Sequence, residues 1–464
     1  MIGGTAILTA AQMRSAEQAA IVSGVPEYEL MERAGAAAAE IIWRVGAKRD
    51  LLVLCGPGNN GGDGFVIAGL LRARGVPVRV AALAESRTES SLRARAAWNG
   101  PIEPFDLTTP ATQIVDALFG TGLSRGLDAS VAERLCNFVA QASFSYAIDL
   151  PSGVETDSGE LLSRVPDFGL CIALGALKPA HVLYPAAGHF RRLICADIGV
   201  SASNEVHLLS VPDLVQPPAS AHKYSRGLVA VVCGEMAGAG HLAALAAARS
   251  GAGMVRRLTS AEGNVGLDAI VTANAKTTVE IADALADDRV SAVVVGPGLG
   301  LDGQAEQRLA TVMACGRPLV LDADALTLIG RGEAGTVAAG SILTPHEGEF
   351  SRLFPDLRGD KIIRARRAAQ RMAAVIVLKG TDSVIAAPDG RTAITTGVSS
   401  WLSTAGTGDV LAGLIAGRLA VTRDAFRAAC EGVWLHGETA RRAGAAFAAD
   451  DLIAHLPAAI ASRL

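Results

Sequence analysis

Short apolar runs recur along the chain and alternate with longer segments of helical periodicity. Apolar runs of about four to eight residues, bounded by glycine, proline or polar residues, are typical of buried strands. Their alternation with helical segments predicts an α/β protein with a doubly wound parallel sheet. The candidate strands are residues 51–55, 76–83, 113–118 and 145–150 in the first half, and 228–233, 290–295, 318–322, 340–344 and 374–379 in the second.

The segment 211–222 separates these two groups of strands. It carries three prolines within about seven residues, and proline continues neither a helix interior nor a central strand. We therefore expect an interdomain linker and two domains, residues 1–212 and 213–464. Near the start of the chain, the pattern from Thr9 to Gln12 is that of a capping box. It predicts a helix that ends near Val22, followed by a second helix over about 26–45.

Composition narrows the class of protein. Half of the residues are hydrophobic but only 4% are aromatic, and the formal net charge is −4 without a long basic run. A nucleic-acid partner is therefore not expected. No apolar stretch approaches the roughly 18 residues of a transmembrane helix, and the first residues lack a signal-peptide pattern, so no membrane partner is expected. The seven cysteines are scattered, which fits reduced thiols in the cytoplasm.

The most informative motif runs from Gly56 to Gly64, where five of nine residues are glycine. It follows the candidate strand 51–55 and precedes a predicted helix over 65–74. Glycines permit sharp turns and leave space for a ligand. A loop that opens a helix also directs free N–H groups toward an anion. Because two asparagines and an aspartate accompany the glycines, the run predicts a binding loop and not a bare turn.

Two further strand ends in the first half carry polar residues. One is the segment 114–126, which contains Asp116 and a Gly-Thr-Gly turn; the other contains Asp149 and Ser152. Ligands bind at the carboxyl ends of strands in open α/β sheets, so Asp63, Asp116 and Asp149 should converge. Clustered carboxylates are costly unless protonated, hydrogen-bonded or bound to a cation. The apolar surroundings of Asp149 favour general acid or base work, although a single aspartate there is often only a helix cap.

In the second half, glycines between Ser403 and Gly413 lead into an apolar helix with Asp409 in its first turn. Its N–H groups could bind a phosphoryl group while Asp409 takes a proton from an attacking hydroxyl. The alternative is a simple N-cap. Asp322 and Asp324 could each be a cap or a magnesium neighbour, and Glu349 could influence a magnesium ion. Other polar strand ends are residues 296–300, 344–349 and 379–383.

The first half resembles NAD(P)H-hydrate epimerases. The resemblance rests on residues 30–35, 56–64, 116–125 and 148–153 and covers about residues 8 to 200. It implies a Rossmann-like domain in which Asp149 is the catalytic carboxylate. A potassium ion would be held by Asn60, Asp116 and Ser152. The residues implied to contact the hydrated nucleotide are Asn59, Asn60, Gly61, Gly62, Asp63, Gly120, Thr121, Gly122, Leu123, Ser124, Arg125, Gly126 and Asp149.

The second half is similar to ADP-dependent NAD(P)H-hydrate dehydratases of the ribokinase-like superfamily. The similarity spans about residues 222 to 455, with motifs at 222–223, 249–253, 296–300, 344–349 and 405–413. It implies a ribokinase-like α/β domain with Asp409 as the catalytic residue, ADP as co-substrate and Mg²⁺ beside the nucleotide. Hydrate contacts are implied for Ala252, Gly298, His346 and Asp409. ADP contacts are implied for Lys379, Gly380, Thr381, Asp382, Ser383 and Gly408.

Together these resemblances imply a bifunctional enzyme that repairs nicotinamide nucleotides. The first domain would interconvert the R and S hydrates of NADH and NADPH (NADHX and NADPHX). The second would dehydrate the S hydrate with ADP, giving AMP and phosphate. A homo-oligomer is expected because ribokinase-like domains often assemble. Two alternatives remain: a ribokinase-like small-molecule kinase with an accessory nucleotide-binding domain, and a nucleotide-sensing module without turnover.

Overall fold

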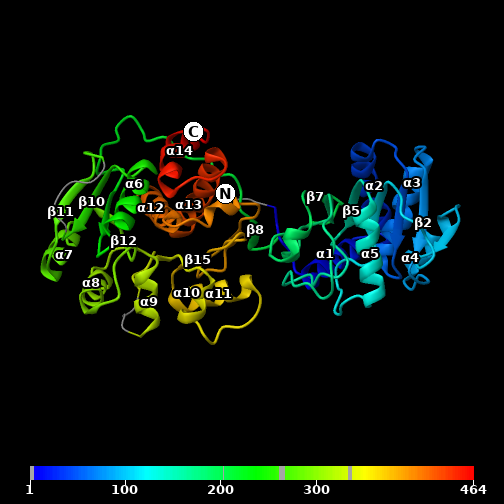
Figure 1. Ribbon diagram of the computed structural model, residues 1–464, viewed down its shortest axis with the longest axis horizontal. Coiled ribbons are helices and arrows are strands. Elements are labelled where there is room, and N and C mark those ends of the chain that lie inside the picture. Colours follow the sequence, from blue (N-terminus) through cyan, green and yellow to red (C-terminus); the bar gives the residue numbers. More distant parts are fainter. Residues whose placement is uncertain (1–4, 202, 261–266, 333–336) are drawn as a thin grey trace. The chain divides into compact units, whose positions relative to one another are not determined.

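A computed structural model describes residues 5–201, 203–260, 267–332 and 337–464. The described chain forms two compact units, which divide between Val206 and His207. Each unit is built on one sheet with helices on both faces (Figure 1). The α/β class and the organisation in two domains are therefore as predicted. Within the described residues, no helix combines the length and the apolar character needed to span a bilayer.

The sheet of the first unit consists of seven parallel strands in the order β3-β2-β1-β4-β5-β6-β7. This order reverses between β1 and β4, as in Rossmann-type sheets, which bind ligands at that point. The strands are β1 Leu51–Cys55, β2 Val78–Ala82, β3 Ile102–Pro104, β4 Gln113–Ala117, β5 Phe144–Ile148, β6 Leu170–Leu174 and β7 Leu193–Ala196. The helices are α1 Ala10–Val22, α2 Glu27–Gly46, α3 Asn59–Ala73, α4 Glu89–Ala97 and α5 Ala129–Gln141.

The central strand β1 is buried on both faces, which explains its uninterrupted apolar sequence. Leu51, Val53 and Cys55 pack in the cluster that includes α2 and α3. Leu52 and Leu54 pack in the cluster that includes α5. At the start of the chain, Thr9 and Gln12 form the predicted capping box of α1.

The glycine-rich run differs from its prediction in one respect, because α3 begins at Asn59 and not after Gly64. None of the five glycines has a positive φ angle, so they are not there for a left-handed turn. A Cβ on Gly61 would lie 1.9 Å from the Gly56 carbonyl oxygen, and one on Gly64 would lie 2.8 Å from the Ala117 side chain. Close approach of α3 to β1 and β4 therefore requires glycine, and it outweighs the poor helix propensity of this sequence.

The second unit is built on a sheet of ten strands in the order β11-β10-β9-β12-β13-β14-β15-β16-β17-β8. The strands are β8 Val206–Leu208, β9 Leu228–Val232, β10 Met254–Thr259, β11 Val271–Asn274, β12 Val290–Val295, β13 Leu319–Leu321, β14 Ile342–Leu343, β15 Val375–Leu378, β16 Val384–Ala386 and β17 Thr392–Ile394. From β11 to β15 all pairs are parallel, whereas β15, β16 and β17 pair antiparallel.

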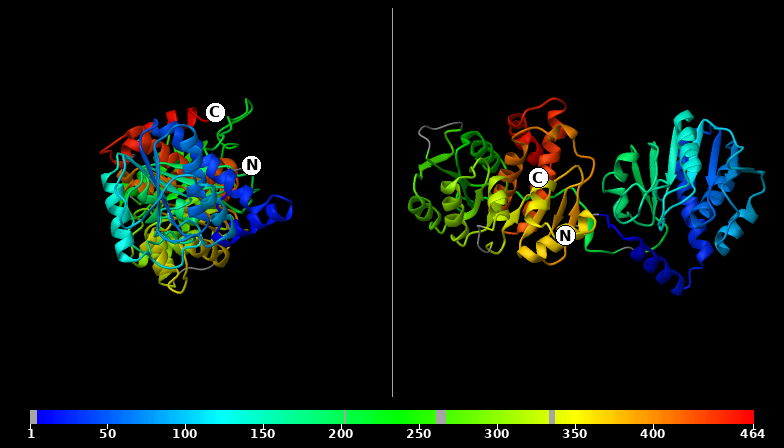
Figure 2. Two further views of the ribbon diagram at one scale, coloured as in Figure 1. Left: turned by 90° about the vertical axis from the view of Figure 1, so that its right-hand side faces the viewer. Right: turned by 60° about the horizontal axis from the view of Figure 1, so that its bottom comes forward.

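Helices cover both faces of this second sheet. Figure 1 shows α6, α12, α13 and α14 on one side and α8, α9, α10 and α11 on the other. The right view of Figure 2 shows the C-terminal helices in red apart from α10 and α11 in yellow. The bounds are α6 Ala237–Arg249, α7 Thr278–Leu285, α8 Gly303–Met313, α9 Asp324–Gly330, α10 Glu347–Leu353, α11 Lys361–Met372, α12 Thr407–Thr422, α13 Ala425–Ala443 and α14 Ala449–Ala461.

The proline-rich segment has no helix or strand over residues 209–218. It is nevertheless attached to the second unit, because Leu214 is buried there and its N–H donates to the Arg463 carbonyl.

A buried ion pair joins α12 to α13 in the core of the second unit. Nε of Arg418 donates to Oε2 of Glu431 at 2.6 Å, and the two side chains are only 5% and 3% exposed. Arg427 donates to the other Glu431 oxygen at 2.7 Å. Both carboxylate oxygens are thus satisfied, and the pair is fully desolvated. Loss of one partner would leave a buried charge without compensation.

We expect Glu431→Gln to lower the stability of this unit by about 3–5 kcal/mol, because Arg418 would stay buried and charged. Glu438→Gln, on the same helix, is the matched control. Its partners Arg441 and Arg442 are 69% and 26% exposed, so their charges stay in contact with water after the substitution and about 0–1 kcal/mol is expected. Hydrogen exchange of peptides from α12 and α13 across a denaturant series measures both losses. Equal losses for the two variants would contradict the expectation.

Candidate active sites

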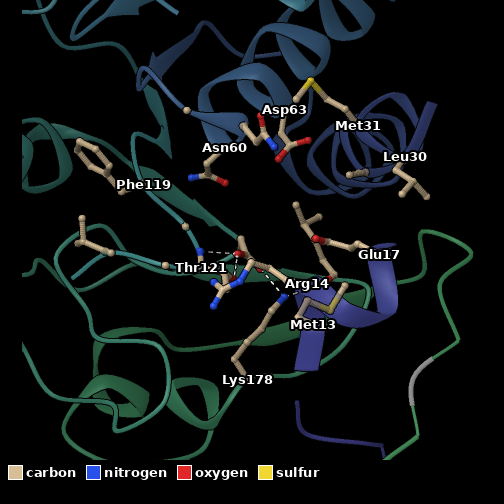
Figure 3. Close-up of a pocket in the computed structure, with 18 of the residues that line it drawn as sticks. Met13, Arg14, Glu17, Leu30, Met31, Asn60, Asp63, Phe119, Thr121 and Lys178 are labelled. Carbon is tan, nitrogen blue, oxygen red and sulfur yellow. Dashed lines mark hydrogen bonds and ion pairs between the residues drawn. The ribbon is translucent and has the colours of Figure 1, made fainter. Parts of the chain in front are cut away.

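The first unit contains a cavity of about 680 Å³ at the point where the strand order reverses. Its walls come from α1, α2, the first turn of α3, the loop after β4, and Asp149 at the end of β5. Figure 3 shows Glu17, Asn60 and Asp63 around this space, with Lys178 on the opposite side. The cavity therefore lies at the carboxyl ends of the strands, where the sequence predicts it.

Asp149 is held in an unusual conformation on one wall. Its φ angle is +62°, a region that non-glycine residues adopt at a cost and mostly at functional sites. Oδ2 accepts hydrogen bonds from N and Oγ1 of Thr121 at 2.8 and 2.5 Å. Oδ1 accepts from Nζ of Lys178 at 2.5 Å. The carboxylate is therefore fixed by three donor atoms from two residues, and Lys178 is itself only 1% exposed.

Asp149 is ionised at neutral pH. Burial by itself would raise the pKa of its carboxyl, but the Lys178 ammonium and the hydrogen bonds from Lys178 and Thr121 outweigh burial and lower it to about 2. The sequence does not decide whether Asp149 acts as a general acid or as a general base. The structure supplies a permanent anion, which can accept a proton or stabilise a developing cation.

His181 connects the two members of this pair. Its Nδ1 accepts from the Lys178 backbone N–H at 2.8 Å, and its Nε2 lies 2.5 Å from the Asp149 carbonyl oxygen. Nε2 must therefore carry the proton. Burial, reinforced by Lys178, lowers the pKa of His181 to about 4, so the ring stays neutral at neutral pH.

Of the three predicted potassium ligands, Asn60 lines the cavity, whereas Asp116 and Ser152 are buried and contact each other. Asp116 is completely buried and accepts from N and Oγ of Ser152 at 2.9 and 2.7 Å. Burial raises the pKa of Asp116 to about 6 in spite of these bonds. Both amide atoms of Asn60 are buried without a hydrogen-bond partner. The loop after β4 links these groups, because a Cβ on Gly120 would lie 3.1 Å from the Asn60 amide oxygen and the N–H of Phe119 donates to Oγ of Ser152. An unpaired buried amide oxygen beside this loop fits an oxygen-seeking cation.

Two more carboxyl groups face the cavity (Figure 3). Asp63 is only 8% exposed, and burial, with the charges of Asp149 and Glu17, raises its pKa well above the usual value. Burial and the Asp149 charge also raise the pKa of Glu17. Asp63 belongs to the predicted binding loop. Glu17 and Lys178 were not predicted from the sequence as site residues. Neither the sequence of α1 nor the Lys178-Pro179 pair indicates that the fold brings these side chains close to Asp149.

Most of the residues predicted to contact the hydrate line this cavity. They are Asn59, Asn60, Asp63, Gly120, Thr121, Gly122, Leu123, Ser124, Arg125 and Asp149. The other three are glycines packed against the protein. A Cβ on Gly61, Gly62 or Gly126 would lie within 2.6 Å of Gly56, Met31 or Leu162, respectively.

In the second unit, a cluster of charged residues lies at the carboxyl ends of β13 and β15. Nζ of Lys379 donates to Oδ1 of Asp322 at 2.6 Å and lies 3.9 Å from Oε2 of Glu349. Gly408, in the first turn of α12, faces the same pair, because a Cβ there would lie 3.6 Å from Asp322 and 3.7 Å from Lys379. The N-terminus of α12 therefore meets a lysine at this edge, an arrangement suited to phosphate groups.

Asp409 follows in the same turn and does not cap the helix. The N-cap of α12 is Gly406, with a φ angle of +87° and no side-chain cap. Burial, together with the charge of Asp322, raises the pKa of Asp409 to about 6, although Lys379 opposes the shift. The N-cap alternative is therefore wrong, and the carboxyl has the proton affinity of a general base that works near neutral pH.

The other predicted residues of this site differ in position. His346 caps α10, where its Nδ1 accepts from the N–H groups of Gly348 and Glu349 at 3.0 and 3.3 Å. Gly298 lies on the loop after β12, at the same edge of the sheet as Lys379. Ala252 precedes β10, whose residue Met254 pairs with Leu228 at the start of β9. It therefore lies at the opposite edge, far from Asp409.

The predicted nucleotide loop follows β15 and is held by local contacts. Nζ of Lys361 donates to Oδ1 of Asp382 at 2.5 Å. Oγ of Ser383 donates to the Gly380 carbonyl at 2.8 Å. Thr381 is exposed at the surface of the loop. Of the predicted ADP contacts, Lys379 and Gly408 therefore lie close together. Residues 380–383 follow Lys379 in the loop after β15.

Comparison with known proteins covers both units. A family model described as NAD(P)H-hydrate dehydratase matches residues 229–462, and one described as YjeF-related protein N-terminus matches residues 27–180. The bifunctional NAD(P)H-hydrate repair enzyme Nnr of Coxiella burnetii is 33% identical over 96% of this chain and 97% of its own length. The enzyme of the same name from Escherichia coli is 32% identical over 95% of this chain and 90% of its own length.

A solved structure supports the fold of the second unit. A ribokinase-like superfamily protein from Enterococcus faecalis matches with a TM-score of 0.50 and 24% identity, covering 57% of this chain and 98% of its own. The ribokinase-like fold predicted for the second half is therefore confirmed.

The first unit is a Rossmann-type domain with a buried, ionised carboxylate. The second is a ribokinase-like domain in which a lysine and a helix N-terminus are suited to bind phosphate. Together they define a two-domain nucleotide-processing enzyme. The similarity of its relatives extends over nearly the whole chain and both domains. The chain belongs to the family of bifunctional NAD(P)H-hydrate repair enzymes.

Proposed function

We propose that the first domain interconverts the R and S hydrates of NADH and NADPH at Asp149, and that the second dehydrates the S hydrate with ADP at Asp409. The observation that carries this proposal is the contrast between the two carboxyl groups. Asp149 is a fixed anion in a cavity, whereas Asp409 titrates near neutral pH at a helix N-terminus beside a lysine. One suits a reaction through a cation, and the other suits phosphoryl transfer to a hydroxyl.

In the first site, the hydrate carries its hydroxyl on the ring carbon next to nitrogen. The nitrogen lone pair assists departure of that hydroxyl, and the ring becomes positively charged. Asp149, locked by Lys178 and Thr121, is placed to stabilise that charge without reorganising. Return of water to the opposite face of the ring inverts the centre.

A potassium ion fits the floor of this site. Asn60 provides an unpaired amide oxygen, and Asp116 and Ser152 provide a carboxylate and a hydroxyl. When bound, the ion supplies positive charge for the nucleotide's phosphates or for the buried Asp116. The loop at Gly120 packs closely against Asn60, because a Cβ on Gly120 would lie only 3.1 Å from the Asn60 oxygen. This packing holds the Asn60 side chain in position.

In the second site, Asp409 takes the proton of the hydrate's hydroxyl as its oxygen attacks the terminal phosphorus of ADP. AMP leaves. The ring nitrogen lone pair then expels the phosphate group, which is a far better leaving group than hydroxide, and loss of a proton from the adjacent ring carbon restores the dihydronicotinamide. Lys379 and the N–H groups near Gly408 would hold the transferring phosphoryl group. Mg²⁺ beside Glu349 or Asp322 would supply further positive charge. Ala252 is not part of this proposal because of its position at the other edge.

The proposed domains are residues 1–212 and 213–464. All seven cysteines are free thiols, which supports a reducing compartment, and we propose the cytoplasm. A homo-oligomer stays a prediction.

The test uses chemically hydrated NADH that contains both epimers, with ADP and K⁺ present. We expect NADH absorbance to recover completely in two phases. The S hydrate is consumed directly in the first, and the R hydrate is consumed through epimerisation in the second. Omission of ADP should prevent both phases, and replacement of K⁺ by Na⁺ should slow only the second.

Each other outcome identifies what fails. Recovery that stops when the S hydrate is exhausted would refute the epimerase proposal and leave the dehydratase. No recovery with either ADP or ATP would refute the dehydratase and favour the small-molecule kinase. Nucleotide binding without any turnover would favour the sensing module.

A further inference from the structure

Asp63 differs from the other carboxyl groups around the epimerase cavity. It is more than nine-tenths buried, it points into the cavity (Figure 3), and it makes no hydrogen bond or ion pair among the described residues. Asp149 is bound by Lys178 and Thr121, and Asp116 by Ser152. A buried carboxyl without a partner is stable only when it is protonated or when a ligand binds it.

Glu17 of α1 is the second feature without an assigned role. It lines the same cavity (Figure 3) and, like Asp63, forms no ion pair among the described residues. The negative charge of Glu17 raises the pKa of Asp63 and so favours the protonated form of Asp63. Two carboxyl groups that share a desolvated space cannot both ionise readily. Glu17 therefore adds to the effect of burial, which also raises the pKa of Asp63.

The cavity thus surrounds its carboxyl groups with opposite influences. Lys178 lowers the pKa of Asp149 and favours its ionised form, whereas burial and negative neighbours raise the pKa of Asp63 and favour its protonated form. When the environments of two carboxyl groups shift their pKa values in opposite directions, one group can act as an acid while the other remains an anion. The reaction needs both, because hydroxide is a poor leaving group unless it is protonated as it departs.

We propose that Asp63 is the proton donor to the hydroxyl of the hydrate, and that Glu17, which lines the same cavity, is a positioning residue for it. The proposal rests on the proposed epimerase function and specifies its chemistry. The proton moves from Asp63 to the hydroxyl oxygen, the C–O bond breaks with its electron pair on the departing water, and the nitrogen lone pair forms the C=N bond. Water then adds to the other face, and its proton returns to Asp63. The overall step consumes no oxidant, reductant or co-reactant.

The groups that face this acid determine its pH dependence. Asp63 faces Asp149, Glu17 and Lys178. Glu17 faces Asp149, Lys178, Arg14 on its own helix and Glu27 on α2. The acid must be protonated to act, so the epimerisation rate should fall as pH rises through the pKa of Asp63. Removal of the Glu17 charge makes Asp63 easier to ionise, so this decline should move to lower pH.

The experiment uses the intact chain and the two-phase NADH recovery with K⁺ and ADP, across a pH series. Asp63→Asn keeps the shape but carries no transferable proton, and we expect its second phase to fall by about 100-fold or more in kcat. Glu17→Gln should retain activity at low pH and shift the alkaline decline to lower pH. Glu29→Gln is the matched control, because Glu29 lies on the surface of α2 paired with Arg33, and its profile should match wild type.

The first phase reports on the dehydratase in every variant, so it should be unchanged, and hydrogen exchange of peptides from α1 and α3 reports on folding of the first unit. An Asp63→Asn second phase near wild type, or a rise in KM with kcat retained, would overturn Asp63 as the acid. A Glu17→Gln decline at the wild-type pH would overturn the positioning role. Absence of a second phase in wild type would instead refute the epimerase function on which the proposal rests.

Discussion

Replacement of Asp409 by asparagine is expected to stop dehydration and to leave epimerisation intact. Asparagine has nearly the same shape but cannot accept the hydroxyl proton, so NADH recovery from the pure S hydrate should fall by about 10²–10⁴-fold. Interconversion of R and S hydrates, followed chromatographically without ADP, should continue at the wild-type rate because its site lies in the other unit. Loss of both activities would contradict independent sites.

A matched control and a pH series strengthen this test. Asp424 caps α13 through its side chain, and Asp424→Asn should keep full dehydration because asparagine is an equally good cap. In wild type, dehydration should decline as pH falls through about 6, the pKa to which burial raises Asp409 next to Asp322, Lys379 and Asp324. The sign follows from the role, because a base must be ionised to accept a proton.

Asp149→Asn is expected to reduce epimerisation to the uncatalysed rate, a loss of about 10²–10⁴-fold. The neutral amide cannot stabilise the ring cation, and Lys178 would add an uncompensated positive charge nearby. Recovery from mixed hydrates should therefore stop once the S hydrate is consumed. Catalysis of the second phase by a folded variant would contradict the role of Asp149.

This substitution also leaves Lys178 buried without its partner, which costs about 3–5 kcal/mol in comparable sites. The double variant Asp149→Asn with Lys178→Met removes both charges and restores a neutral interior. It should fold at least as well as the single variant and remain inactive as an epimerase. If the double variant regained activity, the loss in Asp149→Asn would have come from Lys178 and not from chemistry.

Most central strands of the two sheets could be predicted, because a strand buried on both faces has an uninterrupted apolar sequence. The strands β3, β6, β7 and β11 were not among the candidates, although β6 is also fully buried. Residues 51–55 and 290–295 were predicted to the residue, since a strand buried on both sides has no polar position to confuse its limits. The strand β10 was missed because Arg256 and Arg257 interrupt its apolar run, although Arg257 is 98% buried in the fold. The start of α3 was missed for a related reason, since tertiary packing placed glycine and asparagine inside a helix.

The candidate sites could be located from the sequence, but the protonation states within them could not. Asp149 and Asp409 stand at strand and helix ends that the motifs mark directly. The partner of Asp149 is Lys178, 29 positions further along the chain, and the neighbour of Asp63 is Glu17 on α1. Such pairings depend on how distant segments meet, which local periodicity does not encode. The sequence therefore predicted carboxylate chemistry, and the fold decides which carboxyl is charged.

His181 makes the stability of the first unit sensitive to acid. The imidazole accepts from the Lys178 backbone and donates to the Asp149 backbone only while it is neutral. In the unfolded chain it would take up a proton below its ordinary pKa of about 6.5, but in the fold only below about 4. Between those values the unfolded state binds more protons, so acidification progressively erodes the free energy of unfolding. His181, which hydrogen-bonds the backbone of both Lys178 and Asp149, thus makes the stability around this ion pair depend on pH between about 6.5 and about 4.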